Sequence, residues 1–193
     1  MHFDKTNIII AFDGPDNVGK GTQIALLRKH FSSIPFVISN LDKPVGETDS
    51  EKINYGIAAS KNHLIAKHAV WEKGIPQIVD RMHYTEYAYS ILRGGHSIET
   101  ILELESDFSE MKDSFFTLIF IDEVQNIQSR DDGKSNYDVD NTKQIEIITQ
   151  RFIEISKQSL FDNVIVNIHG KDISTVQNEV LQALCKKFPN LQK

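Results

Sequence analysis

Short apolar runs alternate along the chain with longer stretches in which apolar residues recur at helical spacing. The apolar runs are rich in isoleucine, valine and phenylalanine and cover residues 7–12, 35–40, 76–80, 115–121 and 163–168, of which the second is the weakest. A strand of a parallel sheet that is covered on both faces is almost continuously apolar, so these runs predict buried parallel strands.

The intervening stretches predict helices over residues 19–31, 50–73, 83–93, 97–111, 141–157 and 174–187. Regular alternation of strands and helices is typical of an α/β fold, here a three-layer sandwich around a mainly parallel five-stranded sheet. The polar interval 128–141 lies between a predicted strand and a predicted helix and is interpreted as a loop or lid. At 193 residues, we expect a single domain over 1–193 with a lid segment at about 127–141.

The composition of the chain indicates which classes of binding partner to expect. The net charge of −6 argues against stable nucleic-acid binding, which requires a surplus of basic residues on one face, and favours a small soluble ligand. Cys185 is the only cysteine, so no internal disulfide can form. No secretory signal and no apolar run long enough for a membrane span is present, and we expect a cytoplasmic protein with no membrane partner.

The stretch "IIIAFDGPDNVGKGTQ", residues 8–23, carries the clearest chemistry. From Gly14 to Lys20 it fits the first seven positions of the phosphate-loop pattern G-x-x-x-x-G-K-[ST], between a predicted strand and a predicted helix. Such a loop turns successive backbone N–H groups toward an anion, and the lysine reaches the outer phosphates. The pattern predicts a P-loop fold of the NTPase type that binds ATP through Gly14, Asn17, Val18, Gly19, Lys20, Gly21 and Thr22.

The eighth position of the pattern is Gly21, which has no hydroxyl to offer Mg²⁺, and Thr22 follows it. We therefore expect Mg²⁺ to be held by nucleotide oxygens and water, with Asp80 orienting a water ligand. Asp80 and Arg81 stand at the carboxyl end of a buried strand, where open α/β sheets bind ligands. Arg81 can hold a second phosphate group by a charge-assisted fork.

Beyond the loop, the chain resembles the thymidylate kinase family of nucleoside monophosphate kinases. "FDGPDNVGKGTQ" is similar to that family's "FEG.DG.GK.TQ", and "DRMHYTEYAYS" is similar to its "DRY..S..AYQ". "YGIAASKNHL" resembles the helix that carries "F.A.R", and "FFTLIFIDEVQNIQSR" and "QRFIEI" resemble the segments before and after the lid. The resemblance runs through most of the chain.

The resemblance implies roles for individual residues. Asp16 would face the sugar 3′-hydroxyl, and Arg81 and Lys61 the phosphate of the acceptor. Thr85, Glu86 and Tyr89 would line the base and sugar pocket, and Ile57 would stand where the family stacks a phenylalanine on thymine. The catalytic set would then be Lys20, Arg81, Arg130 and Asp16, with Arg130, and Lys134 beside it, acting from the lid on the transferring phosphoryl group. The resemblance also favours a homodimer.

Several positions depart from the family pattern and bear on the substrate. Ile57 offers no ring for stacking, Lys61 replaces a bidentate fork by a point charge, and Lys43 stands in a turn that lacks the family's arginine. Glu86 would favour a base that presents a hydrogen-bond donor. We therefore expect ATP-dependent transfer to dTMP or a related pyrimidine deoxynucleoside monophosphate, including dUMP or a 5-substituted relative, to give the diphosphate.

Other classes remain open at this point. A deoxynucleoside kinase shares the loop but needs a carboxylate base for a sugar 5′-hydroxyl, a role for which Asp16 or Glu86 is available. A motor ATPase is suggested only by "TLIFIDE", and a nucleotide-binding module without activity would keep the loop alone.

Overall fold

The computed structural model describes residues 7–41, 43–130 and 141–192. Its strands are β1 (Ile9–Asp13), β2 (Val37–Asn40), β3 (Gln77–Asp80), β4 (Phe115–Ile121) and β5 (Asp162–Asn167). Its α-helices are α1 (Lys20–His30), α2 (Asp49–Trp71), α3 (His83–Ser90), α4 (Ile98–Ser106), α5 (Val124–Ser129), α6 (Thr142–Gln158) and α7 (Ile173–Lys187). Short 3₁₀ turns follow as η1 (Ile91–Arg93), η2 (Ser109–Met111) and η3 (Pro189–Gln192).

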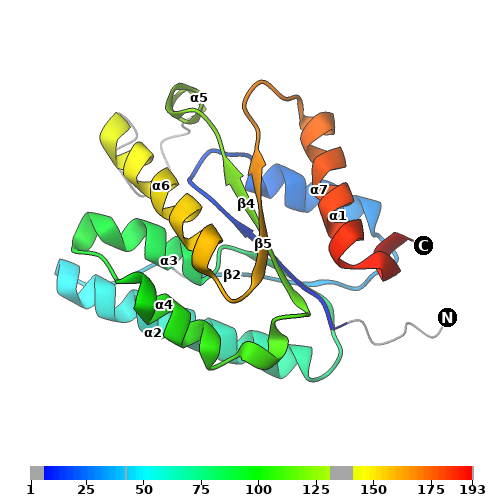
Figure 1. Cartoon of the computed structure of the whole chain (residues 1–193), viewed down its shortest axis with the longest axis horizontal. Coiled ribbons are helices and arrows are strands. Elements are labelled where there is room, and N and C mark those ends of the chain that lie inside the picture. The colour runs from blue at the N-terminus through cyan, green and yellow to red at the C-terminus, as the bar shows by residue number, and fades with distance from the viewer. Residues whose placement is uncertain (1–6, 42, 131–140, 193) are drawn as a thin grey trace.

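The strands form one parallel sheet in the order β2-β3-β1-β4-β5 (Figure 1). β1 is central, and Ile9 lies opposite Gln77 of β3 on one side and Phe115 of β4 on the other. All five residues of β1 are buried, as the continuous apolar run predicts for a strand covered on both faces. The predicted fold class, an α/β protein with a five-stranded parallel sheet, is confirmed.

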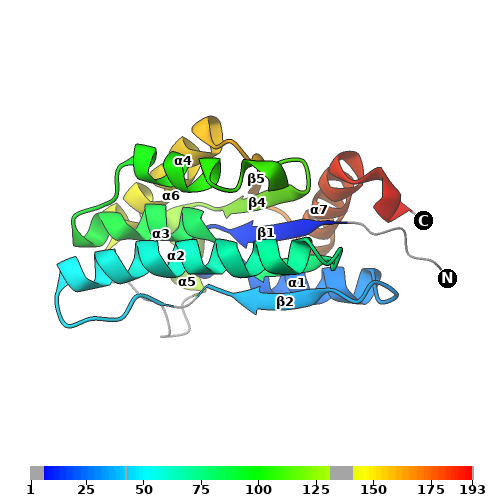
Figure 2. The same ribbon diagram turned by 90° about the horizontal axis from the view of Figure 1, so that it is seen from below.

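Helices cover both faces of this sheet (Figures 1 and 2). The chain runs from β1 outward to β2 and then steps back across the sheet through β3 to β4 and β5. Because crossovers between parallel strands are right-handed, the reversal places α1 on one face with α7, and α2, α3, α4 and α6 on the other. The carboxyl ends of all five strands consequently open onto the same edge of the sheet.

The predicted helices are present, but several begin or end at other residues than expected, because capping interactions fix the ends of a helix. Thr48 and Glu51 form a capping box that starts α2 one residue earlier than expected. The predicted helix over 83–93 changes to a 3₁₀ turn at Ile91 and ends at Gly94, whose φ of 116° no α-helix continues. The six-residue α5 was not anticipated and occupies the start of the predicted lid, of which residues 131–140 lie outside the described residues.

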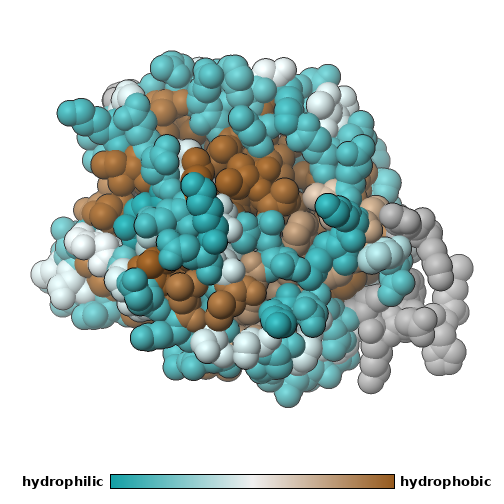
Figure 3. Space-filling model, viewed as in Figure 1, coloured by the Kyte–Doolittle hydropathy of each residue, from teal (hydrophilic) through white to brown (hydrophobic). Residues whose placement is uncertain are grey.

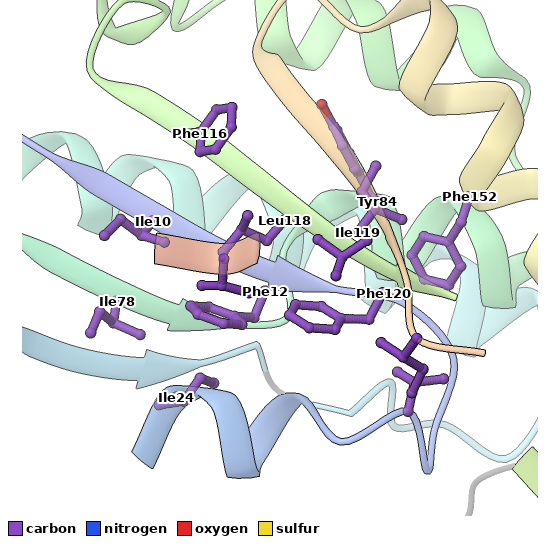
Figure 4. Packing of buried hydrophobic residues seen from close by; sticks show 14 of the residues in the cluster. Ile10, Phe12, Ile24, Ile78, Tyr84, Phe116, Leu118, Ile119, Phe120 and Phe152 are labelled. Atoms are coloured by element: carbon purple, nitrogen blue, oxygen red, sulfur yellow. The ribbon is translucent and has the colours of Figure 1, made fainter. Parts of the chain in front are cut away.

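The core fixes β1 and β4 against each other and against the helices of both layers. Phe12 and Phe120 lie side by side with their rings stacked, 5.7 Å between centroids and 13° between planes (Figure 4). Ile24 of α1 packs below them and Phe152 of α6 above, and all four side chains are buried. This packing makes the end of β1, where the phosphate loop begins, a rigid platform.

The surface is mostly polar in the view of Figure 3, with apolar area in the middle, where β5 lies between α6 and α7 in Figure 1. β5 is an edge strand, so it keeps one side unpaired. In the part of the chain that the structure describes, no helix combines the length and the apolar character that crossing a membrane requires.

Candidate functional site

The phosphate loop leaves β1 in a conformation that its glycines make possible. Gly14 has a φ of 131°, and a Cβ atom at this position would lie 2.2 Å from the carbonyl oxygen of Phe120. Asn17 and Gly19 also have positive φ, 62° and 77°, and Gly19 is the residue before the first turn of α1. The loop therefore wraps closely around the start of a helix, where backbone N–H groups have no helical partner and favour an anion.

We expect Gly14→Ala to lower the free energy of unfolding by about 2 kcal/mol or more, because it adds a clash with β4 to an unfavourable φ. Chemical denaturation measures this change. Gly21→Ala is the matched control, since nothing lies within 4 Å of its Cβ position and it stands in α1. This control should leave stability unchanged or raise it slightly. Equal stability of the two variants would contradict the close approach of the loop to β4.

Lys20 opens α1 and is folded back over the loop. Its ammonium group is buried and donates to the carbonyl oxygens of Gly14 at 3.0 Å and Pro15 at 2.5 Å. Burial, helped by the nearby charge of Arg81, lowers the pKa of Lys20 to about 7. A phosphate group that reaches this loop would add negative charge beside the buried amine and favour its charged form.

Arg81 lies beside the phosphate loop at the end of β3. Its backbone N–H donates to Phe12 at 2.9 Å, and its φ of 69° turns the chain sharply at the sheet edge. The guanidinium forms a hydrogen-bonded ion pair with Asp16 of the loop and lies 5.6 Å from the centre of the Tyr89 ring. Tyr89 in turn accepts a hydrogen bond of 2.8 Å from the backbone N–H of Asp16. A non-glycine residue held at positive φ in an ion pair is typical of a functional site rather than a surface turn.

A first cavity of about 440 Å³ opens in front of Arg81. It collects the predicted residues Asp80, Arg81, Thr85, Glu86 and Tyr89, and also Lys43. The full lining is Asn40, Leu41, Lys43, Pro44, Asp49, Lys52, Asp80, Arg81, Thr85, Glu86, Tyr89, Leu92 and Arg93. The cavity therefore has one cationic group before α3, Arg81, and another at the end of the 3₁₀ turn after it, Arg93. The carboxylate of Glu86 lies between them in the chain.

A second cavity of about 660 Å³ lies on the other side of the loop. Its lining is Val18, Gly19, Thr22, Gln23, Arg130, Ile168, Lys171, Asp172, Ile173, Ser174 and Val176. Arg130 comes from the end of α5, forms an ion pair of 2.7 Å with the buried Asp122 and reaches the carbonyl oxygen of Asn17 at 3.4 Å. The structure thus brings the predicted lid arginine to the phosphate loop.

Ile57 and Lys61, expected near the acceptor, do not line the first cavity. They line a separate hollow between α2 and α4, where Lys61 is half-exposed and pairs with Asp107 at 3.2 Å. The residue of α2 that faces Glu86 is Gly56, whose Cβ position would lie 2.2 Å from that carboxyl group. Successive helical residues are turned by about 100°, so a shift of one position moves a side chain off the facing side.

Other residues of the two cavities were not anticipated from the sequence. Lys52, Leu92 and Arg93 reach the first cavity, and Lys171 and Asp172 reach the second. A signal existed for the last two, because they follow β5, and parallel strands end at a common edge. Lys134, also expected in the lid, lies outside the described residues.

Two carboxylate oxygens near the loop are suited to a hydrated cation. Oδ1 of Asp80 and Oδ2 of Asp13 are buried, and no described residue donates a hydrogen bond to them. Within the described ranges no three histidine, cysteine, aspartate or glutamate side chains are grouped to hold a metal directly. These residues therefore fit the predicted mode, in which Mg²⁺ is held through water.

Comparisons with known proteins agree with this architecture. The structure is similar to a thymidylate kinase from Candida albicans, with a TM-score of 0.69 and 19% sequence identity over 96% of this chain and 93% of that chain. It is also similar to a thymidylate kinase from Ehrlichia chaffeensis, with a TM-score of 0.67 and 18% identity over 92% of this chain and 98% of that chain. No family model and no curated protein sequence matches. The likeness at this identity establishes the fold, and it is the fold that the sequence resemblance implied.

Proposed function

We propose that this chain transfers a phosphoryl group from ATP to the phosphate of a nucleoside monophosphate, in particular dTMP or a related pyrimidine deoxynucleotide, and releases the diphosphate. The arrangement that carries the proposal is a pair of cavities on either side of one phosphate loop, with Arg81 of the first cavity tied to the loop through Asp16. A donor in the second cavity and an acceptor in the first would meet at the loop. The fold shared with thymidylate kinases supports this assignment.

Catalysis of this reaction depends on alignment and charge neutralisation, because the protein supplies little covalent chemistry. The backbone N–H groups of residues 17–20 and the ammonium of Lys20 would bind the outer phosphates of ATP. Arg81 would exchange part of its contact with Asp16 for the acceptor phosphate and bring it into line. Arg130, already against the loop, would leave Asp122 for the transferring group.

Mg²⁺ would be held by water molecules on Asp80 and Asp13 and would neutralise charge on the outer phosphates when bound. Asp80 ends β3 and Asp13 ends β1, two neighbouring parallel strands. Their carboxylates therefore stand at the same sheet edge as the loop.

A deoxynucleoside kinase is the second candidate, and the partners of its two possible base carboxylates count against it. Asp16 is paired with Arg81, and Glu86 with Arg93 and His96. A carboxylate neutralised by a neighbouring cation is a weak general base. Arg81 beside the loop suits an acceptor that already carries a phosphate.

The lowered pKa of Lys20 predicts a pH dependence of ATP binding. Without nucleotide the pKa is about 7, and adjacent phosphates favour the charged form, so the pKa rises in the complex. Binding above pH 7 therefore takes up a proton, and affinity for ATP should fall as the pH rises from 7 to 9. Calorimetry at pH 8 in buffers of different ionisation enthalpy measures the uptake. Lys20→Ala should abolish it, and a wild-type protein that binds ATP without proton uptake would refute the assignment.

The proposed reaction is tested by a coupled ADP-release assay with ATP and Mg²⁺ against every nucleoside monophosphate and every free nucleoside. Activity with monophosphates alone supports the proposal, and activity with free nucleosides alone supports the second candidate. Release of ADP without any acceptor would indicate an ATPase instead. The Candida albicans structure is reported to reveal the origin of broad substrate specificity, which makes a full acceptor panel the appropriate test here as well.

We also propose that the chain forms a homodimer, as the resemblance implies. The long helix α2 supports this assembly, because it packs against α3 and β3 on one side and leaves the apolar side chain of Ile65 48% exposed. Sedimentation at several protein concentrations distinguishes monomer from dimer. Ile65→Glu should shift a dimer to monomer, and a wild-type protein that sediments as a monomer throughout would exclude it.

A further inference from the structure

The inner end of the first cavity holds a buried carboxylate that packs directly on the backbone of α2. Glu86 is 2% exposed, and both of its oxygen atoms lie within 2.4 Å of where a Cβ of Gly56 would stand. A side chain at position 56 would therefore displace Glu86. Among the described residues that line the cavity, Tyr89 is the one aromatic side chain, and a base bound beside Glu86 can be recognised through hydrogen bonds to its edge.

Glu86 is held by two groups that follow α3. Its Oε1 atom accepts from the guanidinium of Arg93 at 3.2 Å and lies 3.2 Å from Nε2 of His96, and its Oε2 atom lies 3.4 Å from the same Arg93 nitrogen. A carboxylate has about four acceptor positions, so these contacts leave it able to accept another hydrogen bond. Glu86 also lines the cavity, where a ligand can use that capacity.

The ion pair with Glu86 holds Arg93 in place but does not use all of its hydrogen-bond donors. It lines the cavity with its side chain 15% exposed, and its Nε atom is buried with no hydrogen-bond acceptor among the described residues. A buried N–H group without a partner is uncommon in a folded protein. Arg93 and Glu86 together therefore offer a ligand an N–H donor beside a carboxylate acceptor.

The position of Arg93 separates it from the phosphate end of the cavity. Arg81 stands at the loop before α3, whereas Arg93 ends the 3₁₀ turn after it. The eight residue steps from Thr85 to Arg93, which lie in α3 and the 3₁₀ turn after it, rise about 12 Å, a span comparable with that from the phosphate of a nucleotide to the edge of its base. Glu86 beside Arg93 would also repel a second phosphate but not a neutral carbonyl group.

We infer that Arg93, positioned by Glu86, reads the base of the acceptor. Arg93 donates to an exocyclic carbonyl oxygen, and Glu86 accepts from the adjacent ring N–H. This pattern selects uracil and thymine and rejects cytosine, which presents an amino group and an unprotonated ring nitrogen at the same positions. The inference rests on the proposed function, and it assigns a specificity role to a residue that the sequence resemblance did not indicate.

The test compares dUMP with dCMP, because the two differ only at this edge. Wild-type protein should show a kcat/KM for dUMP about 100-fold or more above that for dCMP, since a site built for one hydrogen-bond pattern leaves buried groups unpaired with the other. Arg93→Gln should reduce this ratio about tenfold or more, by loss of activity on dUMP. Glu86→Gln, which keeps the shape but removes the charge that fixes Arg93, should lower the ratio in the same direction. Arg28→Gln, on the exposed end of α1, is the control and should leave it unchanged.

An equal preference for dUMP and dCMP in wild type would overturn the inference, as would a ratio that Arg93→Gln leaves unchanged. If Arg93→Gln does not fold, Arg93→Lys keeps the charge without the fork and should give an intermediate ratio. Failure of the proposed function is distinguishable, because wild type would then phosphorylate no nucleoside monophosphate. In that case calorimetric binding of dUMP and dCMP decides the inference, and equal affinities would refute it.

Discussion

Lys20→Ala is expected to lower the rate of phosphoryl transfer by about 100-fold or more while the protein stays folded. The ammonium group is buried at the phosphate loop, where it donates to the carbonyl oxygens of Gly14 and Pro15, so it stands close to the phosphate charge that develops during transfer. Removing it also removes a buried group whose charged form is unfavourable, so the melting temperature should change little. Single-turnover rates at saturating ATP and acceptor measure the loss.

The matched control is Lys29→Ala, in the last turn of the same helix and exposed. It should transfer at the wild-type rate. A Lys20→Ala protein that keeps more than about a tenth of the wild-type rate would contradict a role worth several kcal/mol in the transition state.

Arg81→Ala should reduce kcat/KM for the acceptor by about 100- to 1,000-fold and change the affinity for ATP much less. Arg81 lines the first cavity and forms an ion pair with Asp16 of the loop, so its fork can reach an acceptor in that cavity. Alanine bears the same unfavourable φ of 69° as arginine, and the backbone turn at the sheet edge should persist. Initial rates over a matrix of both substrate concentrations separate the two effects.

Two further variants test whether the effect of Arg81 depends on its bidentate geometry and on its ion pair with Asp16. Arg81→Lys keeps a charge but not the bidentate geometry and should recover only part of the activity. Asp16→Asn keeps the hydrogen bond to Arg81 but weakens the ion pair, and its main effect should be on the acceptor KM. Comparable losses in the apparent affinities for ATP and acceptor in Arg81→Ala would mean that Arg81 supports the loop rather than the acceptor.

The residues of this site that could be predicted from the sequence belong to short contiguous segments of the chain. The phosphate loop is one contiguous segment, and its glycines are required by the local backbone, as the φ of Gly14 shows. Asp80 ends an apolar strand and Arg81 directly follows it, and the parallel order of β1 and β3 brings both residues to the loop. The apolar runs likewise predicted all five strands. β1, β3 and β4 are buried along most of their length, as expected for strands covered on both faces, whereas β2 and β5 have exposed residues.

The rotation of α2 about its own axis, which decides which side chains face the first cavity, could not be predicted from the sequence. Its sequence reads "YGIAASKNHL", in which small and apolar residues occur on more than one side. The resemblance placed Ile57 and Lys61 toward the ligand, whereas the packing of α2 against α3 turns Gly56 toward Glu86. One residue of helix is about 100° of rotation, and only contact with the rest of the fold fixes it.

The charged pairs of the site are also products of the tertiary structure. Arg130 and Asp122 are eight positions apart, across the end of β4 and the length of α5, where no periodicity predicts a contact. Arg93 and Glu86 are seven positions apart, two turns of helix, but whether they pair depends on the 3₁₀ turn that ends this helix. The sequence by itself determined a parallel α/β sheet and a phosphate loop, because both depend on local backbone preference and on burial pattern. The tertiary structure alone decided which side chains meet in the two cavities, because that depends on the rotation of each helix and on where its last turn ends.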